Sequence, residues 1–165
     1  WLNAMEPYQL GGEMIERVTF AKTTYNEIPY KFEAGTPNVA DVMGLGAAVD
    51  YLNGIGWDFI MAQEKDLLTY ATTRLSEVEG VQIIGTAARK AAIISFLIKG
   101  IHFFDAGTII DHMGVAVRTG THCTQPLMDS LQISGTLRAS MAFYNTRQEV
   151  DSLIDAIYKV KALFA

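Results

Sequence analysis

The spacing of the apolar residues changes once along this chain, and that change limits the folds it can adopt. From Val42 to Val78 the apolar side chains recur every three to four residues, which is typical of helices with one apolar face. After Gly80 they form short, largely β-branched runs at 81–84 and 92–98, which indicate paired strands. Helices and a sheet within one chain predict an α+β fold built around one core.

The second half of the sequence alternates helical and extended patterns. Helical spacing returns at 105–113, and a brief strand is predicted at 115–118. A short helix at 126–131 leads into 136–143, where apolar and polar residues alternate as in a half-buried strand. The segment from Thr146 to Glu149 has the spacing of a capping box, which predicts the start of a C-terminal amphipathic helix.

The composition predicts two parts. Residues 1–37 are rich in Gly, Thr, Tyr and Pro and show little periodicity, so we expect an irregular segment there. Residues 38–165 contain no linker and no low-complexity tract, so we expect one α+β domain. Because Trp1 is not a natural initiator, we expect the sequence to be a piece of a longer chain.

Charge and cysteine content exclude several classes of protein. A formal net charge of -5, without a block of Lys and Arg, argues against a nucleic-acid partner. A single cysteine cannot form an internal disulfide, and no signal-peptide pattern is present, so a cytoplasmic protein is expected. The longest apolar runs, such as 91–98, fall far short of the roughly 20 residues of a membrane helix. No His or Cys spacing suits zinc, so no metal site is expected.

Cys123 is the leading candidate for chemistry. It lies in a polar, glycine-containing loop, next to His122 and shortly after Arg118. Neighbouring cationic or imidazole groups favour the thiolate, which is the nucleophilic form of cysteine. The other interpretation is an inert structural cysteine, because free cysteines are frequently buried. The residues alone leave both interpretations open.

Four further residues have a functional and a structural interpretation. His122 could act as an acid or base, shape the loop, or be a satisfied surface imidazole. Arg138 could grip a carboxylate through two hydrogen bonds, or be an edge-strand charge or part of an ion pair. Arg118 ends its own predicted strand and could serve the loop or the substrate. Thr36 lies just ahead of a helix, where it could hold a phosphate or simply belong to a turn and helix cap.

Several segments match a pattern more specific than composition. The Arg-Thr-Gly-x-His-Cys loop and the Arg-Ala-Ser-x-x-x-Tyr-Asn-Thr strand are the most specific, and the segments follow one another in the same order over essentially the whole chain. They are Gly11–Ile15, Phe32–Asn38, Ala116–Cys123, Pro126–Met128 and Arg138–Thr146. Together they resemble the later half of a SufS-like, group II cysteine desulfurase.

The resemblance implies the C-terminal small domain of a fold-type-I pyridoxal-phosphate-dependent transferase. Residues 1–37 and the helix after them would come from the large domain and the dimer interface. In such an enzyme pyridoxal 5'-phosphate activates L-cysteine, a protein thiolate takes the sulfur as a persulfide, and L-alanine leaves. Carried over by position, Cys123 is that thiolate, Arg138 anchors the substrate carboxylate, and Thr36 contacts the cofactor phosphate of the neighbouring subunit.

The resemblance also implies partners and a cellular role. The expected partners are a second copy of the chain, forming a homodimer, and a sulfur-acceptor protein of the SufE/SufU type. The expected role is the supply of sulfur for iron-sulfur cluster assembly.

The chain departs from the family pattern in three respects. Leu10 stands where the family has a third glycine, and Thr121 stands where it has a second histidine. No lysine lies in the Ser-x-His-Lys context of the family's Schiff-base lysine. We therefore expect this chain alone neither to hold the cofactor covalently nor to turn over cysteine.

Two other functions remain open. A selenocysteine lyase or a related fold-type-I enzyme could use the same scaffold. The chain could instead be a non-catalytic remnant that binds a sulfur-acceptor protein or forms a dimer. A persulfide that depends on Cys123 would favour the desulfurase, whereas partner binding that survives Cys123→Ala would favour the remnant.

Overall fold

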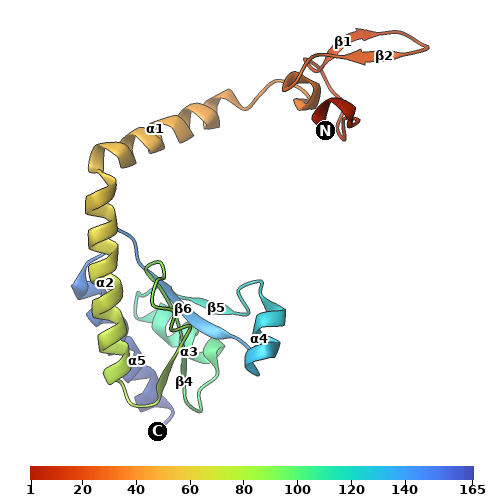
Figure 1. Ribbon diagram of the computed structural model, residues 1–165. Coiled ribbons are helices and arrows are strands. Elements are labelled where there is room, and N and C mark those ends of the chain that lie inside the picture. The colour runs from red at the N-terminus through yellow and green to blue at the C-terminus, as the bar shows by residue number, and fades with distance from the viewer. The chain divides into compact units, whose positions relative to one another are not determined.

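A computed structural model describes all residues from Trp1 to Ala165, and the chain divides into two units, Trp1–Gly54 and Ile55–Ala165. In the first unit, β1 (Ile15–Val18) and β2 (Thr23–Tyr25) form an antiparallel hairpin (Figure 1). Single 3-10 turns lie at Leu2–Ala4 and Tyr30–Phe32.

This hairpin lies within residues 1–37, the segment that the sequence predicts to be irregular. Its strands are short and have no buried residue, so they lack the alternation of apolar and polar residues that would indicate strands. Hydrogen bonds between backbone groups hold the two strands together instead. At the tip of the hairpin the N–H of Thr19 donates to the carbonyl of Lys22 (2.9 Å).

The helix α1 (Val39–Ile55) begins where the sequence predicts. The side-chain oxygen of Asn38 accepts the N–H of Asp41 (3.3 Å), as expected of a residue that caps a helix. None of the side chains of α1 is buried. The first unit ends at Gly54, so it contains nearly all of α1.

The second unit is a four-stranded antiparallel sheet, and three of its four helices, α2, α3 and α5, supply the core residues that pack against one face of the sheet (Figure 1). This arrangement confirms the predicted α+β fold class. In the order β3-β4-β6-β5 the strands are Val81–Ile84, Ile93–Ile98, Thr136–Ser140 and Arg118–Gly120. The helices are α2 (Trp57–Glu77), α3 (Phe103–His112), α4 (Gln125–Leu131) and α5 (Arg147–Leu163). None of the helices in the structure is both long and apolar enough to cross a membrane.

The two faces of this sheet differ in character. Successive side chains of a strand point to opposite faces, so Phe96 of β4 and its register partner Leu137 of β6 point toward α2, α3 and α5, and both are fully buried. Their neighbours Ser95 and Arg138, which are also register partners, point to the other face. That face therefore carries the polar residues from which a site can be built.

Two strands differ from their predicted bounds. The strand predicted at 115–118 is β5, and it pairs with β6 only from Arg118 onward, because the pairing runs from Arg118↔Arg138 to Gly120↔Thr136. The strand predicted to reach residue 143 ends at Ser140.

A tight turn follows β6 and leads into α5. The N–H of Ala142 donates to the side chain of Asn145 (2.8 Å), and the N–H of Asn145 donates to the carbonyl of Ala142 (2.9 Å). The predicted capping box at the start of α5 is confirmed, since the hydroxyl of Thr146 accepts the Glu149 N–H and the Glu149 carboxylate accepts the Thr146 N–H.

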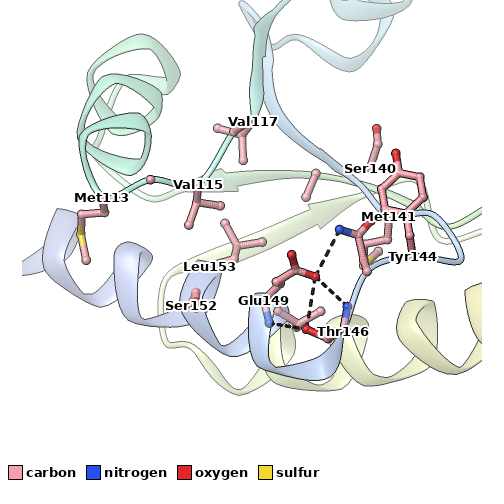
Figure 2. A pocket seen from close by; sticks show the side chains of 15 residues that line it. Met113, Val115, Val117, Ser140, Met141, Tyr144, Thr146, Glu149, Ser152 and Leu153 are labelled. Atoms are coloured by element: carbon pink, nitrogen blue, oxygen red, sulfur yellow. Dashed lines mark hydrogen bonds between the residues drawn. The ribbon is translucent and has the colours of Figure 1, made fainter.

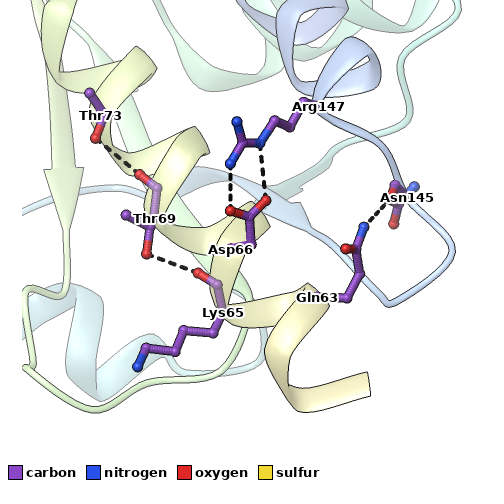
Figure 3. A network of polar contacts seen from close by, with 7 residues as sticks. All are labelled: Gln63, Lys65, Asp66, Thr69, Thr73, Asn145 and Arg147. Carbon is purple, nitrogen blue, oxygen red and sulfur yellow. Dashed lines mark hydrogen bonds and ion pairs between the residues drawn. The ribbon is translucent and has the colours of Figure 1, made fainter. Parts of the chain in front are cut away.

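Polar contacts fasten this turn to α2 (Figure 3). The guanidinium of Arg147 forms a two-pronged ion pair with Asp66, in which Nε donates over 3.0 Å. The amide of Gln63 donates to the carbonyl of Asn145 (3.1 Å). These contacts fix the end of β6, and with it the strand that carries Arg138.

Candidate active site

The loop that carries Cys123 joins β5 to α4. Gly120, His122 and Cys123 have φ values of 112°, 56° and 61°, and positive φ values are uncommon for residues other than glycine. Thr124 closes the turn, because its N–H and its hydroxyl both donate to the carbonyl of Thr121 (3.0 and 2.7 Å). The turn leaves the side chain of Cys123 exposed and free of any disulfide.

Gly135 allows the start of this loop to lie against the second unit's core. A Cβ atom at Gly135 would lie 2.9 Å from the carbonyl carbon of Gly120 and 2.7 Å from Cζ of Phe103. No side chain fits at such distances without displacing its neighbours. The glycine between α4 and β6 thus sets the position from which the cysteine loop leaves the sheet.

The sulfur of Cys123 lies beside a guanidinium. Nη2 of Arg118 donates to Sγ over 3.7 Å. The structure therefore makes the contact that the short spacing between Arg118 and Cys123 only suggested.

Arg118 and Arg138 lie directly opposite each other on β5 and β6. Like charges at such positions destabilise a sheet. The two ion pairs of the structure, Arg74–Asp151 and Arg147–Asp66, include neither of them, and Nε of Arg138 is buried without a hydrogen-bond partner. Two guanidinium groups without a protein carboxylate form a place where a ligand carboxylate can bind.

The side chain of His122 contacts the first residue of β6. Its Nε2 is hydrogen-bonded to Oγ1 of Thr136, the buried first residue of β6 (2.8 Å). Burial lowers the pKa of His122, and the positive charges of Arg138 and Arg118 lower this pKa further. Both effects favour the neutral form of the imidazole. No sequence signal identified Thr136, because a threonine at the start of a strand belongs to no motif.

The lowered pKa of His122 predicts that the free energy of unfolding falls as the pH drops from about 7.5 to about 5.5. The unfolded chain takes up a proton on this residue near its ordinary pKa of about 6.5, whereas the folded chain resists it, so acid favours the unfolded state. Denaturant unfolding curves at several pH values will measure the effect. The variant His122→Asn should lose part of the pH dependence, and identical slopes for both proteins would contradict this account.

Thr36 belongs to the first unit, in the segment ahead of α1. Its side chain is exposed, and the preceding Gly35 has a φ of 88°. The N–H of Gly35 donates to the carbonyl of Gly12 (2.9 Å), which joins two of the segments that carry the family resemblance. The role of Thr36 at a phosphate stays a prediction.

No cluster of three or more His, Cys, Asp or Glu side chains in the structure could hold a metal ion.

A pocket of about 450 Å³ lies elsewhere in the second unit (Figure 2). It is bounded by residues 113–117, the end of β6 and the first turns of α5, and its polar end contains Thr146 and Glu149. The carboxylate of Glu149 is already used by the capping box, and the resulting hydrogen bonds lower its pKa. Because neither Cys123 nor either of the paired arginines lines this pocket, we place the candidate site at the cysteine loop.

Comparison with known protein sequences shows strong similarity over nearly the whole chain. Residues 1–153 match the family described as Aminotransferase class-V. A "Probable cysteine desulfurase" of Xylella fastidiosa is 48% identical over 98% of this chain and 39% of its own length. A "Cysteine desulfurase" of Haloferax volcanii is 45% identical over 99% of this chain and 39% of its own length. The chain thus spans about two fifths of these relatives.

Solved structures give the same result for the fold. The crystal structure of the cysteine desulfurase CsdA from Escherichia coli matches with a TM-score of 0.88 and 37% identity, over 98% of this chain and 40% of that one. An apo cysteine desulfurase structure from Thermococcus onnurineus also matches with a TM-score of 0.88 and 37% identity, over 94% of this chain and 40% of that one.

Proposed function

We propose that this chain, which belongs to the class-V aminotransferase family, is part of a pyridoxal-phosphate-dependent cysteine desulfurase. One observation carries the proposal: the exposed sulfur of Cys123 lies beside Arg118, and the strand position opposite Arg118 holds a second guanidinium, Arg138, without a carboxylate partner. A nucleophile next to a carboxylate-binding cation suits a reaction on the sulfur of an amino acid.

Within the family we propose the SufS-like group, and we propose that this chain is the C-terminal portion of the enzyme. The loop from Arg118 to Cys123 and the strand from Arg138 to Thr146 support both points, because they have the sequence pattern of that group.

In the proposed reaction the thiolate of Cys123 attacks the sulfur of L-cysteine. The new S–S bond forms as the C–S bond breaks, and the electron pair of the C–S bond stays on the substrate carbon. That carbon takes up a proton and leaves as L-alanine, and loss of the substrate thiol's proton leaves Cys123 as a persulfide anion. The transferred sulfur is oxidised and the carbon is reduced, so no external oxidant is needed. When bound, pyridoxal phosphate supplies the electron sink for the substrate carbon.

The residues of this chain hold and orient the reacting groups. Arg138, whose buried Nε has no partner, fits the carboxylate of the substrate. Arg118 keeps the attacking sulfur close to a positive charge. The lowered pKa of His122 disfavours a third positive charge beside the two arginines. Thr36, with an exposed hydroxyl ahead of a helix, fits a contact to the cofactor phosphate of a neighbouring subunit.

The proposal also covers the partners of the enzyme and its cellular location. We propose that the intact enzyme forms a homodimer in the cytoplasm and passes the sulfur of its persulfide to an acceptor protein of the SufE/SufU type for iron-sulfur cluster assembly. The exposure of Cys123 supports this, because a second thiolate must be able to reach the sulfur that it carries.

The decisive experiment compares the intact parent enzyme with this chain. Given L-cysteine, the parent should release alanine and gain one sulfur atom on Cys123, as measured by peptide mass spectrometry. The isolated chain should show neither alanine release nor a cofactor absorbance, because it has no lysine in the Schiff-base context. Turnover of selenocysteine with no turnover of cysteine by the parent would favour a selenocysteine lyase, and turnover by the chain alone would contradict its predicted inactivity.

A further inference from the structure

The backbone that presents Cys123 is strained at two successive residues. His122 and Cys123 both have left-handed φ values, and a residue with a Cβ atom stays in that region only where its surroundings hold it there. The bonds from Thr124 to Thr121 are local to the turn. They close the turn but do not connect it to the sheet.

A hydrogen bond between side chains connects the turn to the sheet. Nε2 of His122 and Oγ1 of Thr136 lie 2.8 Å apart and are 14 positions apart in the sequence. Thr136 is fully buried and begins β6, two positions before Arg138. The threonine is thus a rigid point of attachment, and the histidine that bonds to it is directly followed by the cysteine.

The hydrogen bond between His122 and Thr136 therefore influences where the sulfur of Cys123 lies. If His122 left Thr136, the two left-handed residues could relax, and the side chain of Cys123 would leave the guanidinium of Arg118 that it contacts at 3.7 Å.

We propose that His122 and Thr136 are positioning residues that hold the sulfur of Cys123 beside Arg118. The inference deepens the proposed function and gives these two residues a part in it, but it concerns the geometry of this chain and can be tested without the cofactor.

The test uses the chain itself, in which Cys123 is the single cysteine. We compare its alkylation by iodoacetate, which carries a carboxylate, with its alkylation by neutral iodoacetamide, and take a peptide of residues 119–126 as the reference. The preference is the rate of alkylation by iodoacetate divided by the rate with iodoacetamide. Because Arg118 and Arg138 attract anions, this ratio should be about tenfold larger for the folded chain than for the peptide. Arg118→Gln should remove most of this preference, which shows that the assay senses the guanidinium.

Thr136→Val keeps the size and shape of the side chain but removes the hydroxyl, so the preference should fall toward that of the peptide. Thr136→Ser restores a hydroxyl and should restore the preference, which a purely structural role for the residue does not predict. His122→Gly relieves the backbone strain and removes the imidazole. It should also lose the preference for iodoacetate. If Thr136→Val alters the far-UV spectrum or the melting temperature, His122→Gly takes its place as the test of the proposal.

Full preference in both folded Thr136→Val and His122→Gly would overturn the proposal, as would a loss in Thr136→Ser as large as in Thr136→Val. A separate result decides the proposed function. If the intact parent forms no persulfide on Cys123 while the alkylation preference follows Thr136, the desulfurase assignment fails and the positioning role stands.

Discussion

Replacing Cys123 with alanine in the intact parent enzyme should reduce sulfur transfer by about 10³-fold or more, because loss of a covalent nucleophile typically has an effect of at least this size. The exposed sulfur beside Arg118 is the one thiol in this chain that can accept sulfur. The cofactor absorbance should stay unchanged, since Cys123 is not expected to touch the cofactor. Alanine release and persulfide mass, measured under single-turnover conditions, will give the result.

A matched control is Ser130→Ala, an exposed position on α4, close to the same loop in sequence. It should leave sulfur transfer within about twofold of the unmodified enzyme, as surface substitutions usually do. Cys123→Ser should behave like Cys123→Ala, because a hydroxyl cannot carry sulfur as a persulfide. An alanine variant that kept its full rate of persulfide formation would place the nucleophile elsewhere.

The helices of the second unit follow from local sequence patterns. α5 begins at its predicted capping box, and α2 follows its stripe of apolar residues, because a helix is held by bonds between residues close in sequence. Strands are less predictable, since a strand exists only where another backbone lies beside it. Val115–Val117 has the composition of a strand but is not paired, whereas the polar segment Thr23–Tyr25 is paired in the hairpin.

In the candidate site, too, local sequence predicts some features, whereas others depend on how distant segments pair. Cys123 and Arg138 could be singled out by residue type and by resemblance, since each stands in a specific motif. The placement of Arg118 opposite Arg138 depends on the register of β5 and β6, which no local pattern determines. The bond from His122 to Thr136 depends on a left-handed turn, and neither histidine nor cysteine signals such a turn in the way that glycine does.

Replacing Arg138 with alanine in the intact parent should lower kcat/KM for L-cysteine by roughly 10²-fold, which corresponds to about 3 kcal/mol for lost charge-assisted hydrogen bonds. The guanidinium has no protein carboxylate to satisfy it, so removing it should cost binding of the substrate and little stability. Arg138→Lys should recover only part of the loss, because lysine keeps the charge but not the planar fork. Arg89→Ala, at an exposed arginine before β4, is the matched control and should have no effect.

A substrate without a carboxylate separates binding by Arg138 from a general effect on the site. Cysteamine has the amine and the thiol of cysteine but no carboxylate, so the unmodified enzyme should strongly prefer cysteine, and Arg138→Ala should remove most of that preference. The difference in rate between the two substrates is the informative quantity, because a distorted site would slow both of them equally. If Arg138→Ala lowered the rates for cysteine and cysteamine by the same factor, the carboxylate would be held by another group, and Arg118, its neighbour across the strand pair, would be the next to test.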